Sequence, residues 1–206
     1  LFVYKKFKIS DLFDEVTKKS PEWITSGKDV QYKVKDKVLY IQGTQSFIDW
    51  VYNLKLGVIP YKDMEETFKV HRGFLALWKS IRDEIRELDF EIILGYSQGA
   101  ALAGFVHEDF FYRKGYEPIT IAIGCPGFIW GKIPEKLARR FTKFYRFSGP
   151  HDIVTHSPPE LWGYKKPGPN TILKVKEKIK KPKDYPWHLW LLGHMPVEYK
   201  ARLAAA

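Results

Sequence analysis

The chain has 206 residues, of which 45% are hydrophobic and 16% aromatic, so it is not a disordered chain and can bury the core of one domain over residues 1–206. No apolar run approaches the roughly 18 residues of a membrane span. The formal net charge is +10, but no nucleic-acid-binding motif accompanies the basic residues, so a nucleic-acid partner is not expected.

The N-terminal part of the chain predicts a helix followed by a β-hairpin. Ser10 is the expected cap of a helix over residues 11–19, whose first turn carries acidic side chains that the helix dipole favours. Residues 30–34 and 38–41 have the β-branched and aromatic character of two strands joined by a turn at 35–37. The second strand runs directly into Gly43-Thr-Gln-Ser46.

The next segment, residues 46–60, is short and rich in large apolar side chains. It ends with Gly57 and Pro60, two residues that interrupt regular structure. Such a segment is either an ordinary buried helix or a mobile cover over an apolar cleft. The residue pattern alone leaves both interpretations open.

Beyond this segment, short apolar strands alternate with helices. Strands are predicted at 67–70, 92–94, 119–123 and 144–147, and helices at 74–88, from residue 97 to about 113, and near 134–141. Strands that are apolar throughout indicate an α/β fold with a mostly parallel sheet covered by helices on both faces. In such sheets, functional residues gather at the carboxyl ends of the strands.

One of these strand ends carries a Gly-x-Ser-x-Gly motif, Gly95-Tyr-Ser-Gln-Gly99. The order of strand, sharp turn and helix is typical of a serine held in a strained backbone conformation, with its hydroxyl exposed above the sheet. The two glycines are expected because a Cβ atom at either position would collide with the adjacent strand or helix. Ser97 is therefore the candidate nucleophile.

Asp152 follows the strand at 144–147 and so lies at the same end of the predicted sheet as Ser97. His188 and His194 come later, which gives the order Ser-Asp-His of α/β-hydrolases. An imidazole takes a serine proton near neutral pH, and a carboxylate fixes its tautomer. Tryptophans flank His188 and suggest a packed position, whereas a glycine before His194 suggests an exposed loop, so both remain candidate bases. The histidines expected to be structural are His71 and His156.

Further blocks surround these residues in a fixed order. They are Ile41-Gln-Gly-Thr44 with Asp49-Trp50, Val70-His-Arg-Gly-Phe74, the serine turn, Gly124 with Pro126, Asp152-Ile-Val154 with Pro158-Pro159, and His194 with Tyr199. Over roughly residues 30–200, the sequence resembles the class 3, fungal-type lipase family. The resemblance implies an α/β-hydrolase fold, hydrolysis of carboxylic esters of lipids, no cofactor and a lid that opens at a lipid interface.

Carried over by position, the resemblance assigns Ser97 as nucleophile, Asp152 as acid and His194 as general base. It implies an oxyanion hole formed by the backbone N–H groups of Thr44 and Gln98. The segment 46–60 corresponds to the lid, and its candidate substrate-contacting residues are Phe47, Ile48, Trp50, Val51 and Leu54.

Two departures from the family pattern stand out. The family usually has His-Ser-Leu at the serine turn, whereas this chain has Tyr96-Ser97-Gln98, which is similar to the turn of cutinases. Gly127 stands where the family commonly has arginine, which bears on packing beside the Asp152 loop. A cutinase-like esterase and a phospholipase are therefore alternatives to an acylglycerol lipase.

The basic residues support a further alternative. Eight lysines lie between residues 165 and 183, which is either a solvated loop or a surface that attracts anionic lipid. A non-catalytic lipid-binding module would also use such a surface. The expected partner is a lipid or acyl ester met at a lipid interface, and the protein is expected to be a monomer. A single cysteine and no recognisable signal peptide favour the cytoplasm, with a secreted mature form as the alternative.

Overall fold

The computed structural model describes residues 3–4, 7–43, 57–62, 68–173 and 193–205. Its main feature is a seven-stranded sheet in the order β13-β11-β9-β8-β5-β4-β3. In that order the strands are Asn170–Ile172, Phe144–Ser148, Ile119–Ile123, Ile92–Tyr96, Val38–Ile41, Val30–Lys35 and Ile24–Ser26. The five strands from β13 to β5 are parallel, while β4 and β3 are antiparallel, so the prediction of a mostly parallel sheet is confirmed.

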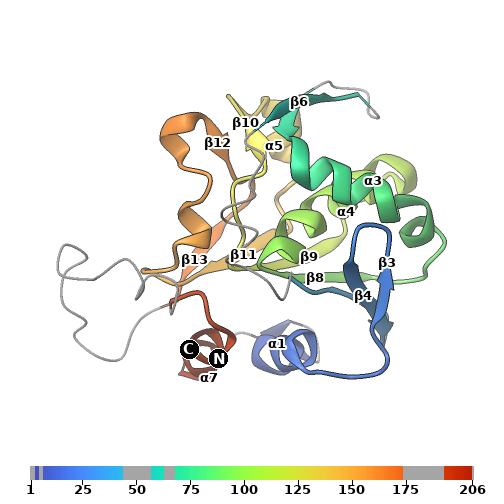
Figure 1. Ribbon diagram of the computed structural model, residues 1–206, viewed down its shortest axis with the longest axis vertical. Coiled ribbons are helices and arrows are strands. Elements are labelled where there is room, and N and C mark those ends of the chain that lie inside the picture. The colour runs from blue at the N-terminus through green and yellow to red at the C-terminus, as the bar shows by residue number, and fades with distance from the viewer. Residues whose placement is uncertain (1–2, 5–6, 44–56, 63–67, 174–192, 206) are drawn as a thin grey trace.

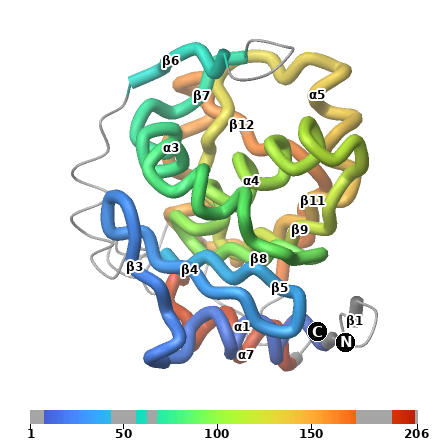
Figure 2. Tube along the Cα trace, turned by 90° about the vertical axis from the view of Figure 1, so that its right-hand side faces the viewer, coloured from blue at the N-terminus to red at the C-terminus, as the bar shows by residue number. Residues whose placement is uncertain are grey.

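Helices cover both faces of this sheet, as Figure 2 shows. Helices α3 (Arg72–Arg86) and α4 (Gln98–Lys114) lie on one face, and α1 (Ile9–Thr17) and α7 (Pro196–Ala205) lie on the other. Successive side chains of a strand point to opposite faces. In β5, Leu39 and Ile41 therefore join the core under α3 and α4, whereas Val38 and Tyr40 join the core that includes α1 and α7.

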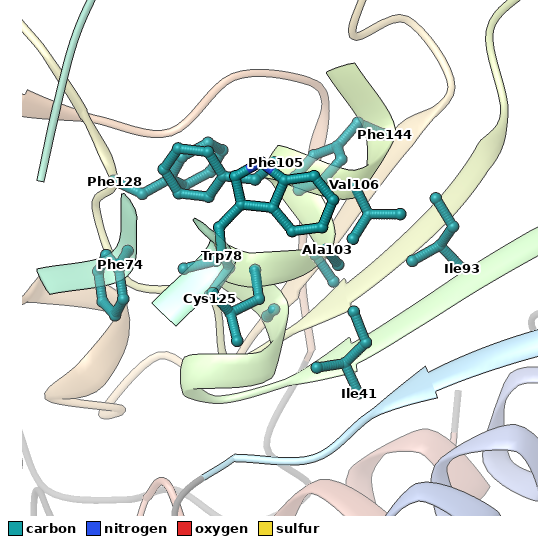
Figure 3. Close-up of a cluster of buried hydrophobic side chains, with 14 of the residues drawn as sticks. Ile41, Phe74, Trp78, Ile93, Ala103, Phe105, Val106, Cys125, Phe128 and Phe144 are labelled. Atoms are coloured by element: carbon teal, nitrogen blue, oxygen red, sulfur yellow. The ribbon is translucent and has the colours of Figure 1, made fainter. Parts of the chain in front are cut away.

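The core on the α3 and α4 side is dominated by aromatic rings (Figure 3). Trp78 of α3 is completely buried and donates a hydrogen bond from its indole Nε1 to the Tyr61 hydroxyl at 3.0 Å. Phe105 of α4 packs against both Tyr61 and Phe128. Trp78, Ile81 and Ile85, at spacings of three and four, thus place one face of α3 in this core.

A second sheet of four antiparallel strands lies beyond α3 and α4 in the order β12-β10-β7-β6 (Figure 1). Its strands are Tyr164–Lys165, Ile129–Trp130, Phe68–His71 and Val58–Tyr61. The strand predicted at 67–70 exists as β7, but it belongs to this sheet and not to the parallel one. The end of the segment 46–60 forms β6, and residues 46–56 lie outside the described residues.

The remaining elements are short. They are β1 (Val3–Tyr4) and β2 (Phe7–Lys8), helix α5 (Glu135–Arg139), and the 3-10 helices η1 (Val154–His156) and η2 (Glu160–Trp162). Within the described ranges, no helix combines the length and apolar character needed to cross a membrane.

The predicted cap of the first helix is wrong. Helix α1 begins at Ile9, and its N-cap residue is Lys8, which makes no side-chain capping bond. Ser10 lies inside the first turn, where its hydroxyl contacts the Asp11 carboxylate at 3.2 Å. The helix is held instead by its apolar face, which includes the buried Leu12 and Phe13, because tertiary packing contributes more than a cap to a short helix.

Helix α3 has a histidine cap, which confirms the structural assignment of His71. Its Nδ1 accepts hydrogen bonds from the N–H groups of Gly73 at 3.1 Å and Phe74 at 3.3 Å. The ring can accept there only while Nδ1 carries no proton. Burial lowers the pKa of His71 to about 4, and the positive end of the helix dipole disfavours a charged ring in the same direction.

We expect this cap to make the protein acid-sensitive. The pKa of His71 is about 6.5 in the unfolded chain and about 4 in the folded protein. Between these two pH values, the unfolded chain is protonated at His71 and the folded protein is not. Stability is therefore lost as the pH falls through this window, by about 3 kcal/mol from this group. His71→Asn keeps a capping acceptor that does not titrate. Urea unfolding at pH 7 and pH 4.5 should show a smaller loss for this variant, and equal losses would contradict the assignment.

Candidate active site

Ser97 lies at the sharp turn between β8 and α4, as the motif predicted. Its backbone has a φ of 59° and a ψ of −125°, a conformation that side-chain-bearing residues rarely adopt. A Cβ atom on Gly95 would lie 2.3 Å from the Gly99 carbonyl oxygen, and one on Gly99 would lie 2.2 Å from that of Ile41. The two glycines are thus required by the close approach of strand and helix.

The structure brings Ser97, His194 and Asp152 together at the carboxyl ends of β8 and β11. His194 Nε2 lies 2.8 Å from the Ser97 hydroxyl, and His194 Nδ1 lies 2.9 Å from Asp152 Oδ2. These distances are those of hydrogen bonds. All three residues are buried, with exposed fractions of 4%, 5% and 0% for Ser97, His194 and Asp152. Ser97 and His194 themselves are therefore not exposed as expected, although Met195, the next residue of the loop, is 48% exposed.

The Asp152 carboxylate is held by donors on both oxygens. Oδ1 accepts a hydrogen bond from the N–H of Val154 at 2.8 Å, within a turn that continues into η1. Oδ2 accepts from the Tyr199 hydroxyl at 2.5 Å as well as from the imidazole. Burial, followed by the charge of Asp152, raises the pKa of Tyr199 well above its usual value, so this phenol stays a donor.

His194 is positioned by an aromatic residue of the serine turn. The Tyr96 ring stacks on the imidazole with a centroid separation of 5.2 Å and an interplanar angle of 12°. The Tyr96 hydroxyl also donates a hydrogen bond to the His194 backbone carbonyl. Gly124, with a φ of 62°, leaves room for the ring, because a Cβ there would lie 2.8 Å from His194 Cε1. Backbone and ring of His194 are thus fixed separately.

The sequence alone did not assign positioning roles to Tyr96, Gly124 or Tyr199. In the sequence, Tyr96 stands out only as a departure from the usual histidine, and Gly124 and Tyr199 only as parts of the blocks shared with the family. These roles depend on contacts between residues that are far apart in the sequence. The Tyr96 hydroxyl, for example, donates to a carbonyl 98 residues away. No local pattern encodes such a contact.

Of the two predicted oxyanion-hole residues, the structure describes Gln98 but not Thr44. Gln98 is the first residue of α4, so its N–H has no intrahelical acceptor. Thr44 lies outside the described residues, but the preceding Gly43 is close to the nucleophile. A Cβ on Gly43 would lie 2.7 Å from Ser97 Cβ and 3.2 Å from its hydroxyl oxygen.

Several other predictions fall outside the described residues. They are the lid residues Phe47, Ile48, Trp50, Val51 and Leu54, the rival base His188, and the lysines from Lys174 to Lys183. Of the other predicted positions, Gly127 donates its N–H to the Ser157 carbonyl at 3.0 Å and so packs beside the Asp152 loop without a side chain. His156 is exposed at the end of η1.

The chemistry available at this site is proton transfer and nucleophilic attack. Hydrogen bonds link the serine hydroxyl to the imidazole and the imidazole to the buried carboxylate. This arrangement activates a serine. Within the described ranges, no three His, Cys, Asp or Glu side chains are grouped as metal ligands would be.

Solved structures of fungal lipases share this fold. The lipase from Rhizopus microsporus var. chinensis matches with a TM-score of 0.60 and 23% identity, over 75% of this chain and 62% of that chain. Lipase II from Rhizopus niveus matches with a TM-score of 0.61 and 22% identity, over 81% and 74%. A mutant form of MDLA from Penicillium cyclopium gives 0.63 and 20%, over 89% and 79%. The chain thus spans less than two thirds of the first of these proteins.

The sequence match to a known family is more specific than the shared fold. Residues 38–162 match the family described as lipase (class 3). This range is more than half of the chain and contains the serine turn and Asp152. The parallel sheet with helices on both faces is the α/β-hydrolase architecture expected of that family. The chain therefore belongs to the class 3 lipase family.

Proposed function

We propose that the protein is a serine hydrolase of carboxylic esters, acting on acylglycerols or related lipid esters. The observation that carries the proposal is the line of hydrogen bonds from the Ser97 hydroxyl through His194 to Asp152, at 2.8 and 2.9 Å. Membership of the class 3 lipase family supports the substrate class. One of the similar structures, 18% identical to this chain, is described as a triacylglycerol lipase whose catalytic centre is a serine protease triad.

In the first half of the reaction, Ser97 attacks the ester carbonyl while His194 Nε2 takes the hydroxyl proton. Asp152 accepts a hydrogen bond from Nδ1, so it fixes the tautomer and stabilises the imidazolium that forms. The N–H groups of Gln98 and Thr44 stabilise the tetrahedral oxyanion, an effect worth about 3–4 kcal/mol for one donor. His194 then protonates the leaving alcohol.

The second half releases the acyl group. Water enters, His194 takes one of its protons, and the resulting hydroxide attacks the acyl-serine carbonyl. The same oxyanion donors stabilise the second tetrahedral intermediate. Collapse of that intermediate returns the proton to Ser97 and frees the carboxylic acid. No cofactor takes part in these steps.

The segment 46–60 is proposed as a lid over the acyl-binding cleft of a monomeric enzyme. Its apolar residues suit contact with a lipid interface, and its last residues are anchored in β6, which pairs with β7. Activity on an insoluble ester should then rise steeply once the ester exceeds its solubility limit. A plain saturation curve through that limit would instead favour an open, cutinase-like esterase.

A fluorophosphonate probe tests the proposed chemistry directly. The reagent phosphonylates only an activated serine, so mass spectrometry of the digested protein should find one adduct, on Ser97. Ser97→Ala should abolish the adduct, and it serves as the control for reaction elsewhere. An unlabelled protein that still binds lipid vesicles would favour the non-catalytic lipid-binding alternative. Esters from acetate to palmitate then define the acyl preference.

Tyr96 provides a prediction about positioning. Tyr96→Phe keeps the ring stacked on His194 but removes the hydrogen bond to its buried carbonyl, which costs about 1–3 kcal/mol. We expect kcat for a soluble ester to fall about tenfold, with KM nearly unchanged, because the base is less well placed. Tyr40→Phe, at a buried tyrosine in the same core, is the matched control. Equal kcat values for the two variants would contradict a positioning role.

A further inference from the structure

A pocket lies beside the loop that carries Asp152. It has a volume of about 420 Å³, which is within the range of small-molecule sites, about 300–1,000 Å³. Its walls come from the end of β11, the loop at 149–160 and strand β13, with Lys166 beside β12. Strands β13 and β11 are neighbours at one edge of the central sheet. Neither Ser97, His194 nor Asp152 lines it.

Two cations line this pocket, and both are largely withdrawn from water. Arg146 projects from β11, and Lys166 has a side chain that is only 10% exposed. Burial lowers the pKa of both groups, and the charge of Arg146 acts in the same direction on Lys166. A guanidinium nevertheless stays protonated in proteins. The pocket therefore holds fixed positive charge in a partly desolvated place.

The charges of these two side chains are incompletely compensated. Lys166 donates to the Thr155 carbonyl and lies 3.7 Å from the Glu160 carboxylate, which is also 3.7 Å from Lys165. Arg146 donates from Nη2 to the Gly168 carbonyl at 3.1 Å. Within the described part of the chain, its buried Nε has no hydrogen-bond partner, and no carboxylate pairs with it. Buried charges are normally paired, because leaving water is costly.

An anion in the pocket would supply the missing partner of Arg146 and a counter-charge for Lys166. The planar guanidinium donates two parallel hydrogen bonds to phosphate oxygens, and an ammonium supplies a second charge for a dianion. Ser148 and Asn170 also line the pocket. The Ser148 hydroxyl donates to Asn170 Oδ1 at 3.1 Å, and the amide NH2 of Asn170 is a further donor. We propose that this pocket, defined by Arg146 and Lys166, binds a phosphate group, either as a free phosphate compound or as the headgroup of an anionic phospholipid.

Calorimetric titration of the full chain tests the proposal, with inorganic phosphate as the probe and sodium chloride holding ionic strength constant. Arg146→Gln should weaken phosphate binding at least tenfold, since it removes the charged donor. Lys165→Met is the matched control, because it removes a neighbouring charge that does not line the pocket. Equal weakening by the two variants would overturn the proposal in favour of a diffuse positive surface. Acetate binding as tightly as phosphate would overturn the ligand class.

The only cysteine allows a second measurement in the wild-type protein, which does not depend on whether the Arg146→Gln variant folds. Cys125 lines the pocket, is buried, and has its pKa raised to about 12 by burial. Its slow reaction with a thiol reagent should become at least fivefold slower in phosphate than in chloride at equal ionic strength. An unchanged rate would overturn the proposal.

Lipid vesicles then identify the source of the phosphate group. Phosphatidylcholine vesicles with and without phosphatidic acid are compared for sedimentation with the protein, in the presence and absence of free phosphate. Retention on phosphatidic acid that free phosphate displaces supports a headgroup site, and phosphate binding without retention supports a soluble phosphate compound. All measurements can be made in Ser97→Ala protein, so their outcome is independent of the proposed ester hydrolysis.

Discussion

Replacing Ser97 by alanine is expected to lower kcat/KM for a p-nitrophenyl ester by about 10⁴- to 10⁶-fold. The change removes the nucleophile, while the imidazole and the oxyanion donors remain to promote a slow attack by water. Burst kinetics with wild-type protein and the absence of a burst in the variant would locate the loss in acyl-enzyme formation. No other substitution in the chain is expected to have a larger effect.

A matched control exists in an edge strand of the sheet. Ser26 lies in the edge strand β3, and its hydroxyl contacts the Glu84 carboxylate. Ser26→Ala removes a hydroxyl of the same kind, and we expect its kcat/KM to stay within twofold of wild type. Thermal unfolding should show that both variants keep the fold. A Ser97→Ala protein that retains full activity would refute the serine mechanism outright.

The second large effect is expected from Asp152→Asn, for a reason visible in the hydrogen bonds around the carboxylate. Three donors point at its two oxygens: the N–H of Val154, the Tyr199 hydroxyl and His194 Nδ1. An asparagine has one acceptor oxygen and one donor group. Either the amide donates toward Nδ1 and forces the wrong imidazole tautomer, or it opposes the N–H of Val154. We expect kcat to fall about 10³- to 10⁴-fold.

Tyr199→Phe is the matched comparison for this prediction. It removes one donor from the same oxygen without changing the acceptor that faces the imidazole. Its kcat should fall only about 10- to 100-fold, since one hydrogen bond to a charged group is worth about 1.5–3 kcal/mol. If Asp152→Asn loses no more than Tyr199→Phe while both stay folded, the carboxylate does not control the tautomer.

The parallel sheet and the serine turn could be predicted because their signals are local. The apolar run Ile92–Leu94 followed by Gly95 and Gly99 requires a strand, a tight turn and a helix within a few residues. Asp152 could be placed near Ser97 because the carboxyl ends of parallel strands lie at the same edge of a sheet. The choice of His194 over His188 came from the family pattern, since spacing alone left both open.

The second sheet and the burial of the site could not be predicted in the same way. Strand β7 pairs with β6 and β10, and the pairing with β10 joins Val70 to Ile129, far apart along the chain. Non-local pairing of short strands leaves little trace in the sequence. The glycine before His194 suggested exposure, but its role is steric, because a Cβ on Gly193 would lie 2.4 Å from the His151 carbonyl oxygen.

The position of His194 just before α7 has a consequence for the order in which the protein acquires its chemistry. During synthesis, Ser97 and Asp152 emerge from the ribosome well before His194. A nascent chain ending at residue 173 already contains every described strand of the central sheet. It lacks the base, and it lacks the helix whose packing against α1 holds Tyr199 in the core. Unfinished chains would thus lack the imidazole that contacts the Ser97 hydroxyl.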